Sequence, residues 1–334
     1  MTINLDTTYL NLKLRSPLVV SALPLSDSVD NVKRMEDAGA GAVVLYSVFE
    51  EQVRIERQML KYLQQNPKAT AEDAQKLFPM RDEFRVTIDE YLEHIRKCKQ
   101  TVSIPIIASL NCKSFGGWTS FAQRIGEAGA DALELNIYHM PTDMDRTSEQ
   151  VETLYLTILE IVKAAVNIPV AVKLSPYFTN LAQLARQFDK VGADGLVLFN
   201  RFYQPDFNPQ TLRLHAEMPL AQRGDSRLPL HWIAILYGYI KADLAATGGI
   251  FTAQDIVKML MVGANITMLA SVLLKKDIGY IGTLEQNLRQ WLERNDYESV
   301  QGLQGIMRQF HSKDPSAFER NTYLHAITSY AAEN

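Results

Sequence analysis

The chain has 334 residues, of which 47% are hydrophobic and 22% charged, and its formal net charge is −4. These values are typical of a compact globular protein and exclude a disordered chain. The small negative charge, without any dense run of Lys or Arg, argues against nucleic acid as a partner.

A sequence motif that joins a helix to a strand occurs four times along the chain. In each copy a glycine follows an amphipathic helix and precedes a short apolar strand, at Gly39, Gly129, Gly192 and Gly263. Glycine at this place is typical of a left-handed helix C-cap. With the apolar runs between these joints, eight strands are predicted at about 17–22, 41–47, 104–110, 131–137, 169–174, 194–200, 243–248 and 265–271.

The predicted strands lack polar alternation, which indicates a parallel sheet that is buried on both faces. Eight strands that alternate with helices favour a single (β/α)8 TIM barrel over residues 1–334. An open doubly wound sheet is the alternative, but the segment Ala22-Leu-Pro-Leu-Ser26 after the first strand lacks the expected glycine-rich fingerprint.

Two connections, at about 49–84 and 201–230, are too long for simple turns. At the carboxyl ends of barrel strands such insertions usually serve function, so both could cover a site; surface or oligomer contacts are the other interpretation. From about residue 280 the chain is predicted to be helical, with one apolar stripe formed by Leu284, Leu288, Trp291 and Leu292.

The amino terminus lacks the basic and apolar regions of a secretory signal, and no stretch reaches roughly 18 uninterrupted apolar residues. We therefore expect a cytoplasmic protein without a membrane partner. The only cysteines, Cys98 and Cys112, form no CxxC pattern. They are expected to be half-buried thiols, and no metal site is indicated.

Polar residues that end apolar barrel strands are the candidates for function, because the active sites of these barrels lie there. They are Ser21, Tyr46, Ser47, Ser109, Asn111, Asn136, Lys173, Asn200, Thr247 and Ser271.

The segments Thr247-Gly248-Gly249 and Ala270-Ser271 end the last two strands, just before helices. Backbone N–H groups at such a place can hold a phosphate, although the glycines could also merely turn the chain. Substituting valine for either glycine should then prevent cofactor binding while the protein stays folded.

Lys173 ends the strand Val170-Ala-Val-Lys and would enter the barrel mouth, so it should have an anionic partner unless it reaches water. A flavin could be that partner, because its N1–C2=O2 edge gains charge when the ring is reduced. Asn136 and Asn200 can hydrogen-bond a flavin edge or a planar substrate, or simply cap their strands.

Several sequence motifs and one single residue occur in a characteristic order and spacing. They are Asn11-Leu-Lys-Leu-Arg-Ser-Pro-Leu-Val, Leu133-Glu-Leu-Asn136, Val172-Lys173-Leu-Ser-Pro-Tyr-Phe, the residue Asn200, and Ala246-Thr-Gly-Gly-Ile followed by Gln254-Asp255. In these motifs residues 12–306 resemble the dihydroorotate dehydrogenase family. The resemblance implies FMN as cofactor and oxidation of dihydroorotate to orotate in pyrimidine biosynthesis.

The resemblance also implies roles for individual residues. Asn136 would contact flavin and substrate, Asn200 would lie at the flavin ring and the substrate, and Lys173 would lie at the ring. Four residues would hold the phosphate, and two more are expected at the cofactor: Gly248, Gly249, Ala270 and Ser271, with Ala22 and Ser47.

The departures from the family pattern concern the chemistry. Leu45-Tyr46-Ser47 stands where the family has a lysine, and Asn136-Ile-Tyr-His139 stands where it has a Cys or Ser base. The family's substrate-binding Asn-x-x-Gly segment is not recognisable around Phe78-Pro-Met-Arg81.

His139 is the best replacement base, since a neutral imidazole accepts a proton near pH 7, although it could be a structural histidine. Tyr138 and Asp143 are weaker candidates. The expected enzyme is an FMN-dependent dehydrogenase with a small-molecule substrate, dihydroorotate by default, that forms a homodimer. A dehydrogenase for another small cyclic substrate, a flavin-binding barrel with little turnover and a phosphate-binding aldolase with Lys173 as Schiff-base nucleophile stay open.

Overall fold

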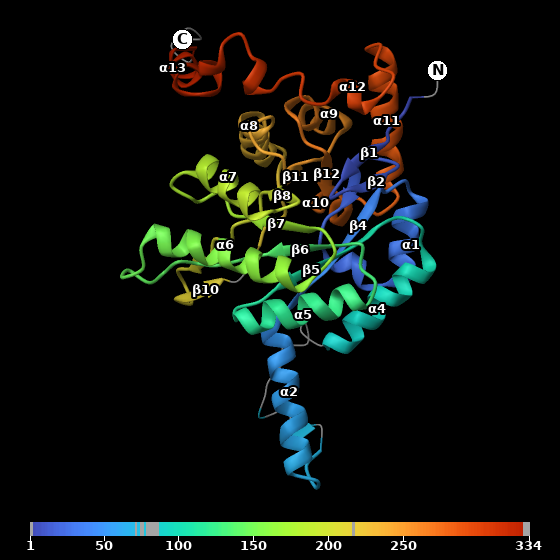
Figure 1. Ribbon diagram of the computed structural model, residues 1–334, viewed down its shortest axis with the longest axis vertical. Helices are drawn as coiled ribbons and strands as arrows, with labels where there is room; N and C mark the ends of the chain where they lie inside the picture. The colour runs from blue at the N-terminus through green and yellow to red at the C-terminus, as the bar shows by residue number, and fades with distance from the viewer. Residues whose placement is uncertain (1–2, 71, 74–76, 78–86, 216–217, 330–334) are drawn as a thin grey trace.

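The computed structural model describes residues 3–70, 72–73, 77, 87–215 and 218–329. Its centre is a closed barrel of eight parallel strands, in the spatial order β3, β4, β5, β6, β7, β8, β11, β12 (Figure 1). Their bounds are β3 Leu18–Val20, β4 Ala42–Phe49, β5 Ile106–Asn111, β6 Ala132–Asn136, β7 Val170–Leu174, β8 Gly195–Leu198, β11 Asp243–Thr247 and β12 Ile266–Leu269. The predicted TIM barrel is confirmed. Each predicted strand overlaps an observed strand, and their bounds agree to within a few residues.

Helices surround the barrel on its outer side (Figure 1). Along the chain, the helices within the described residues are α1 Val29–Asp37, α2 Glu50–Gln65, α4 Ile88–Thr101, α5 Phe115–Glu127, α6 Ser148–Ala165, α7 Leu181–Val191, α8 Arg227–Leu236, α9 Ala253–Val262, α10 Ser271–Lys275, α11 Tyr280–Arg294, α12 Val300–Leu303 and α13 Arg320–Ser329. The four joint glycines all have the positive φ of a left-handed cap, between 94° and 116°. The recurring motif is therefore the element that returns the chain from helix to barrel.

Strand residues alternate between two cores. Leu133 and Leu135 of β6 pack outward against the helices, whereas Ala132 belongs to a second apolar cluster inside the barrel. A short hairpin, β1 Thr7–Tyr9 and β2 Leu12–Leu14, contributes Tyr9 and Leu10 to that inner cluster. The amide of Leu10 donates to Asp243 at the start of β11, so the hairpin closes the amino-terminal end of the barrel.

The two long connections differ in form. The first begins with α2, which extends away from the barrel (Figure 1). Its Glu50 carboxylate accepts the amides of Lys113 and Ser114, where α5 begins, and so fixes the base of α2 to the neighbouring β5–α5 turn. The segment around Phe78-Pro-Met-Arg81 lies outside the described residues.

The second connection contains a two-stranded hairpin, β9 Asp206–Asn208 and β10 Arg213–His215, and the 3-10 turn η3 Arg223–Ser226. The carboxyl-terminal region is helical as expected, and Leu284, Leu288 and Leu292 of α11 are fully buried. Two further 3-10 turns, η4 Gln309–His311 and η5 Pro315–Phe318, precede α13, and η1 Pro24–Asp27 follows β3.

Candidate active site

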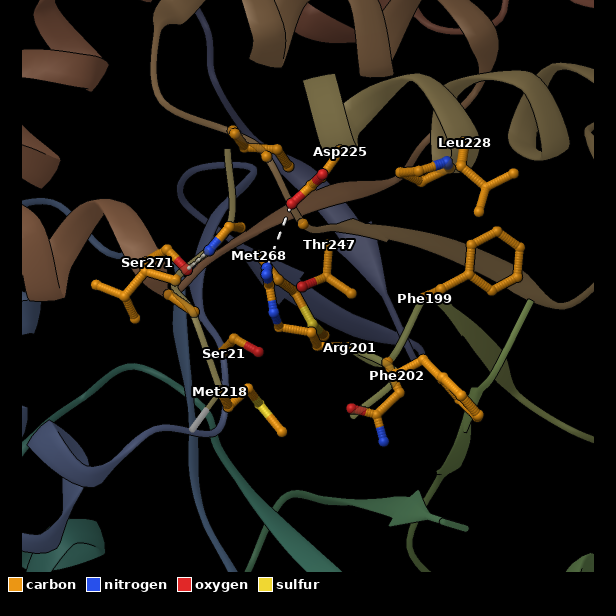
Figure 2. Close-up of a pocket in the computed structure, with 18 of the residues that line it drawn as sticks. Ser21, Phe199, Arg201, Phe202, Met218, Asp225, Leu228, Thr247, Met268 and Ser271 are labelled. Atoms are coloured by element: carbon orange, nitrogen blue, oxygen red, sulfur yellow. Dashed lines mark hydrogen bonds and ion pairs between the residues drawn. The ribbon is translucent and has the colours of Figure 1, made fainter. Parts of the chain in front are cut away.

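A cavity of about 870 Å³ lies at the carboxyl ends of β3, β7, β8, β11 and β12 (Figure 2). Nine of the predicted residues line it: Ser21, Ala22, Lys173, Asn200, Thr247, Gly248, Gly249, Ala270 and Ser271. The second long connection covers it with Met218, Leu220 and Asp225. Ser47, Asn136 and His139 are not part of the lining.

The two glycines after β11 have different surroundings. Gly248 (φ +97°) has room for a Cβ, with no heavy atom within 4 Å, so its open side faces free space in the cavity wall. A Cβ on Gly249 (φ +70°) would lie 2.4 Å from the backbone nitrogen of Ser226 in η3. The expectation that valine at either position leaves the protein folded is therefore wrong for Gly249, whose missing side chain lets η3 pack closely.

Ser271 connects the end of β12 to the second long connection. Its hydroxyl accepts the amide of Ala221 at 3.0 Å, and the Lys275 ammonium donates to the Ala221 carbonyl at 2.9 Å. The hydroxyl thus anchors the covering segment, which the sequence alone did not indicate.

Arg201 follows Asn200 directly and was not among the predicted site residues. Its guanidinium reaches from the end of β8 toward Asp225, with Nη1 3.3 Å from Oδ2 (Figure 2). The ion pair links the β8 end to η3 over the cavity. A cation next to a strand-terminal asparagine was the signal available in the sequence.

Lys173 is buried at the cavity, as the apolar strand before it predicted, and it has an anionic partner within the chain. Its Nζ lies 3.4 Å from Oε1 of Glu134, and the two side chains are 8% and 1% exposed. Glu134 is not among the predicted site residues, because only the terminal asparagine of Leu133-Glu-Leu-Asn136 ends the strand. A carboxylate two residues before Asn136 points to the same side of β6, and this spacing was the available signal.

A bulge in β4 determines which residue of Tyr46-Ser47 enters the barrel. Val44 pairs with Ile107 but Ser47 pairs with Ser109, so β4 has one extra residue there. The Ser47 hydroxyl lies 2.7 Å from that of Ser109. Tyr46 packs instead against the rings of Tyr91 and His94, so its candidacy as a barrel-mouth residue is wrong.

Hydrogen bonds join Ser47 to the asparagines on the far strands. Asn136 Nδ2 donates to the Ser47 hydroxyl at 3.3 Å, and Asn200 Nδ2 donates to Asn136 Oδ1 at 2.6 Å. This chain crosses the barrel mouth from β4 to β8. It places two carboxamides and a hydroxyl, all only partly buried, where a planar molecule over the mouth would meet them.

His139 lies on the loop after β6, outside the cavity lining. Its Nε2 is buried, and no hydrogen-bond partner for it is found among the described residues. Burial, with a smaller contribution from Arg146, lowers the pKa of the imidazole below its ordinary value of 6.5. Burial therefore favours the neutral ring, and Nε2 has no partner among the described residues.

The two weaker base candidates have other surroundings. The Tyr138 hydroxyl accepts the amide of Tyr203 at 2.9 Å, which ties the β6 loop to the segment after β8. Asp143 lines a separate surface hollow with Phe115 and Arg146. Neither lines the large cavity.

Both cysteines are buried rather than half-buried, and burial raises the pKa of Cys98 to about 11. In the described part of the chain, no three His, Cys, Asp or Glu side chains come together in a way that could hold a metal. None of the helices within those residues has the length and apolar character needed to cross a membrane.

Comparison with known proteins gives one consistent family. The family profile described as dihydroorotate dehydrogenase matches residues 85–292, which is more than half of the chain. A putative dihydroorotate dehydrogenase A (fumarate) of Aeropyrum pernix is 28% identical over 228 residues, covering 64% of this chain and 72% of the relative.

Two catalytic subunits of dihydroorotate dehydrogenase B (NAD(+)) align over nearly their whole length. The subunit of Thermoplasma volcanium is 24% identical, with 91% of this chain and 98% of the relative covered. That of Pyrococcus abyssi is 23% identical, with 90% and 98% covered. The predicted resemblance is confirmed: the chain belongs to the dihydroorotate dehydrogenase family, whose members are flavoproteins.

Proposed function

We propose that this protein is an FMN-dependent dehydrogenase that oxidises dihydroorotate to orotate. The observation that carries the proposal is one cavity in which Lys173 and Asn200 occur together with the open side of Gly248. Three different strand ends thus supply a cation, a carboxamide and a close backbone approach to one bound molecule.

The residues present fit FMN. A volume of about 870 Å³ is within the range of cofactor sites. Gly248 leaves a space in the wall that a side chain would fill, as a phosphate site requires. Ala22 and Met268 offer apolar surface to a planar ring, while Lys173 and Asn200 offer hydrogen-bond donors to its edge.

Each group of site residues has a distinct role in the proposed reaction. Backbone amides of the Gly248-Gly249 and Ala270-Ser271 segments bind the phosphate, and Lys173 orients the ring edge. Asn136 and Asn200, held in one hydrogen-bonded chain with Ser47, orient the substrate over the ring. Bound FMN supplies the hydride acceptor.

His139 takes the proton from the substrate carbon in this proposal. A general base must be unprotonated and able to accept, and the lowered pKa and free Nε2 meet both requirements. Tyr138 suits the role less well, because its hydroxyl already accepts the Tyr203 amide.

A second candidate is a dehydrogenase of the same fold for another small cyclic substrate. The observation that favours it is Ser47: the bulge in β4 points a neutral hydroxyl, instead of the lysine of the family, toward Asn136. The polar groups that meet the substrate would then differ from those of its relatives.

Anaerobic mixing of the FMN-loaded protein with dihydroorotate tests the proposal. Bleaching of the visible flavin absorption, followed by reoxidation with fumarate or NAD+, is the expected result. A yellow protein that dihydroorotate does not bleach, but that another reduced cyclic amide does, would support the second candidate. A colourless protein that binds no added FMN would refute both.

A further inference from the structure

The buried ion pair beneath the cavity involves a carboxylate with no role so far. Glu134 and Lys173 project from the neighbouring strands β6 and β7, and their charged atoms are 3.4 Å apart. Lys173 lines the cavity, whereas Glu134 lies behind it and is 1% exposed. A molecule bound next to the Lys173 ammonium is therefore also subject to the electrostatic field of the Glu134 carboxylate.

Glu134 has few other partners. Its Oε1 accepts the Ser109 hydroxyl at 3.5 Å, while its buried Oε2 has no partner among the described residues. An ionised carboxylate in such a place is costly unless a nearby opposite charge compensates it. Lys173 is the cation that does so. Each of the two buried charges thus offsets the desolvation cost of the other.

We propose that Glu134 is a positioning residue that holds the Lys173 ammonium and offsets part of its charge, so that a flavin bound beside Lys173 is a weaker oxidant than it would be beside an unpaired lysine. The proposal rests on the proposed function, because it takes the flavin ring to lie at Lys173. The balance of the two charges, more than the lysine alone, then sets the tendency of the ring to accept electrons.

Glu134 and Lys173 act on a bound flavin through their charges at short range. Reduction adds negative charge to the ring edge, which the ammonium attracts and the carboxylate repels. Inside a protein both effects are stronger than in water. The charge of Glu134 also affects a more distant group. Burial is the main cause of the raised pKa of Tyr9 inside the barrel, and the Glu134 carboxylate raises that pKa further.

A double-mutant cycle on the protein without cofactor tests the pair. Removing only Lys173, as in Lys173→Met, leaves an uncompensated buried carboxylate, whereas Lys173→Met with Glu134→Gln leaves two neutral groups. We expect the double variant to unfold at a higher denaturant concentration than Lys173→Met alone. The cycle also needs the single variant Glu134→Gln. If the losses in free energy of unfolding of Lys173→Met and Glu134→Gln simply add in the double variant, the two groups are not coupled and the claim is overturned.

The midpoint potential of bound FMN tests the effect on the flavin. Glu134→Gln keeps an oxygen toward Lys173 but removes the charge, and should shift the potential to more positive values. Glu134→Asp should stay closer to wild type because it keeps the charge. Glu36→Gln is the matched control, since Glu36 is also buried but bonds Lys33 and Ser103 outside the barrel.

The outcomes separate the two levels of the argument. An unchanged potential in Glu134→Gln with FMN bound would refute the role of Glu134 while leaving the proposed function intact. Failure of wild type to bind FMN would refute the proposed function, and the double-mutant cycle would still decide whether Glu134 and Lys173 are coupled.

Discussion

The two sides of the barrel mouth differ in how their functional residues are organised. On the side of β7, β8, β11 and β12, Lys173, Asn200, Gly248 and Ser271 share one cavity. On the side of β4 and β6, Ser47 and Asn136 are linked by a hydrogen bond, but His139 lies on a loop outside that cavity. The places of the strand-end residues follow from barrel closure, whereas the place of the loop that carries His139 does not.

The two sides also differ in how closely their residues match the motifs of the resemblance. Lys173, Asn200 and Gly248 belong to the sequence motifs that carry the resemblance, whereas Ser47, itself expected at the cofactor, and His139 depart from those motifs and lie on the other side. Under the proposed function, different strands supply most of the cofactor contacts and the proton acceptor, so the two can be tested independently.

The largest expected effect is on the base side. His139→Asn should lower the rate of flavin reduction by the substrate about 10²–10⁴-fold, because a carboxamide cannot accept the proton. FMN binding should be unchanged, since His139 does not line the cavity. Stopped-flow measurement of flavin bleaching checks both. A normal reduction rate in His139→Asn would assign the base to another residue.

The pH dependence of the same rate should show the lowered pKa of His139. The neutral imidazole is the active form, so the rate should rise with pH and level off above the pKa, with the midpoint below 6.5 because burial favours the neutral ring. The profile should disappear in His139→Asn. A midpoint near that of an ordinary thiol would indicate a different base.

On the cofactor side, Gly248→Val should reduce FMN affinity by a factor of about 100 or more, which corresponds to about 2.8 kcal/mol. The added side chain enters free space where the phosphate should lie, and the positive φ adds strain of about 1–2 kcal/mol. Fluorescence titration with FMN measures the loss.

Gly249→Val is the matched contrast at the neighbouring position. Its Cβ would overlap the backbone of η3, so this variant should lose stability even without cofactor. Circular dichroism during heating separates the two variants. A Gly248→Val protein that retains full FMN would place the phosphate elsewhere.

The smallest expected effect concerns the hydrogen bonds that hold Asn136 on the β4 and β6 side. Ser47→Ala removes the hydrogen bonds to Ser109 and Asn136, and each is worth about 1 kcal/mol of stability. The reduction rate should fall modestly, since Asn136 loses one support. Tyr46→Phe is the control, because Tyr46 packs outside the barrel. Equal rates in both variants would show that Ser47 does not help to orient Asn136.

Local patterns in the sequence determined the barrel, the helix-to-strand joints and the strand ends that line the cavity. Glycine at a helix end and continuous apolar strands act within a few residues, so their consequences can be derived without knowing the fold. Strand order then brings Lys173, Asn200 and Gly248 together, because all carboxyl ends of a parallel barrel lie on one side.

Only the tertiary structure decided the direction and the partners of individual side chains. The bulge in β4 turns Ser47 inward and Tyr46 outward, and it depends on pairing with β5, about sixty residues away. Packing against η3 decides that Gly249 cannot take a side chain. The pairing of β6 with β7 places Glu134 beside Lys173. Each is a contact between residues distant in sequence, which no local pattern specifies.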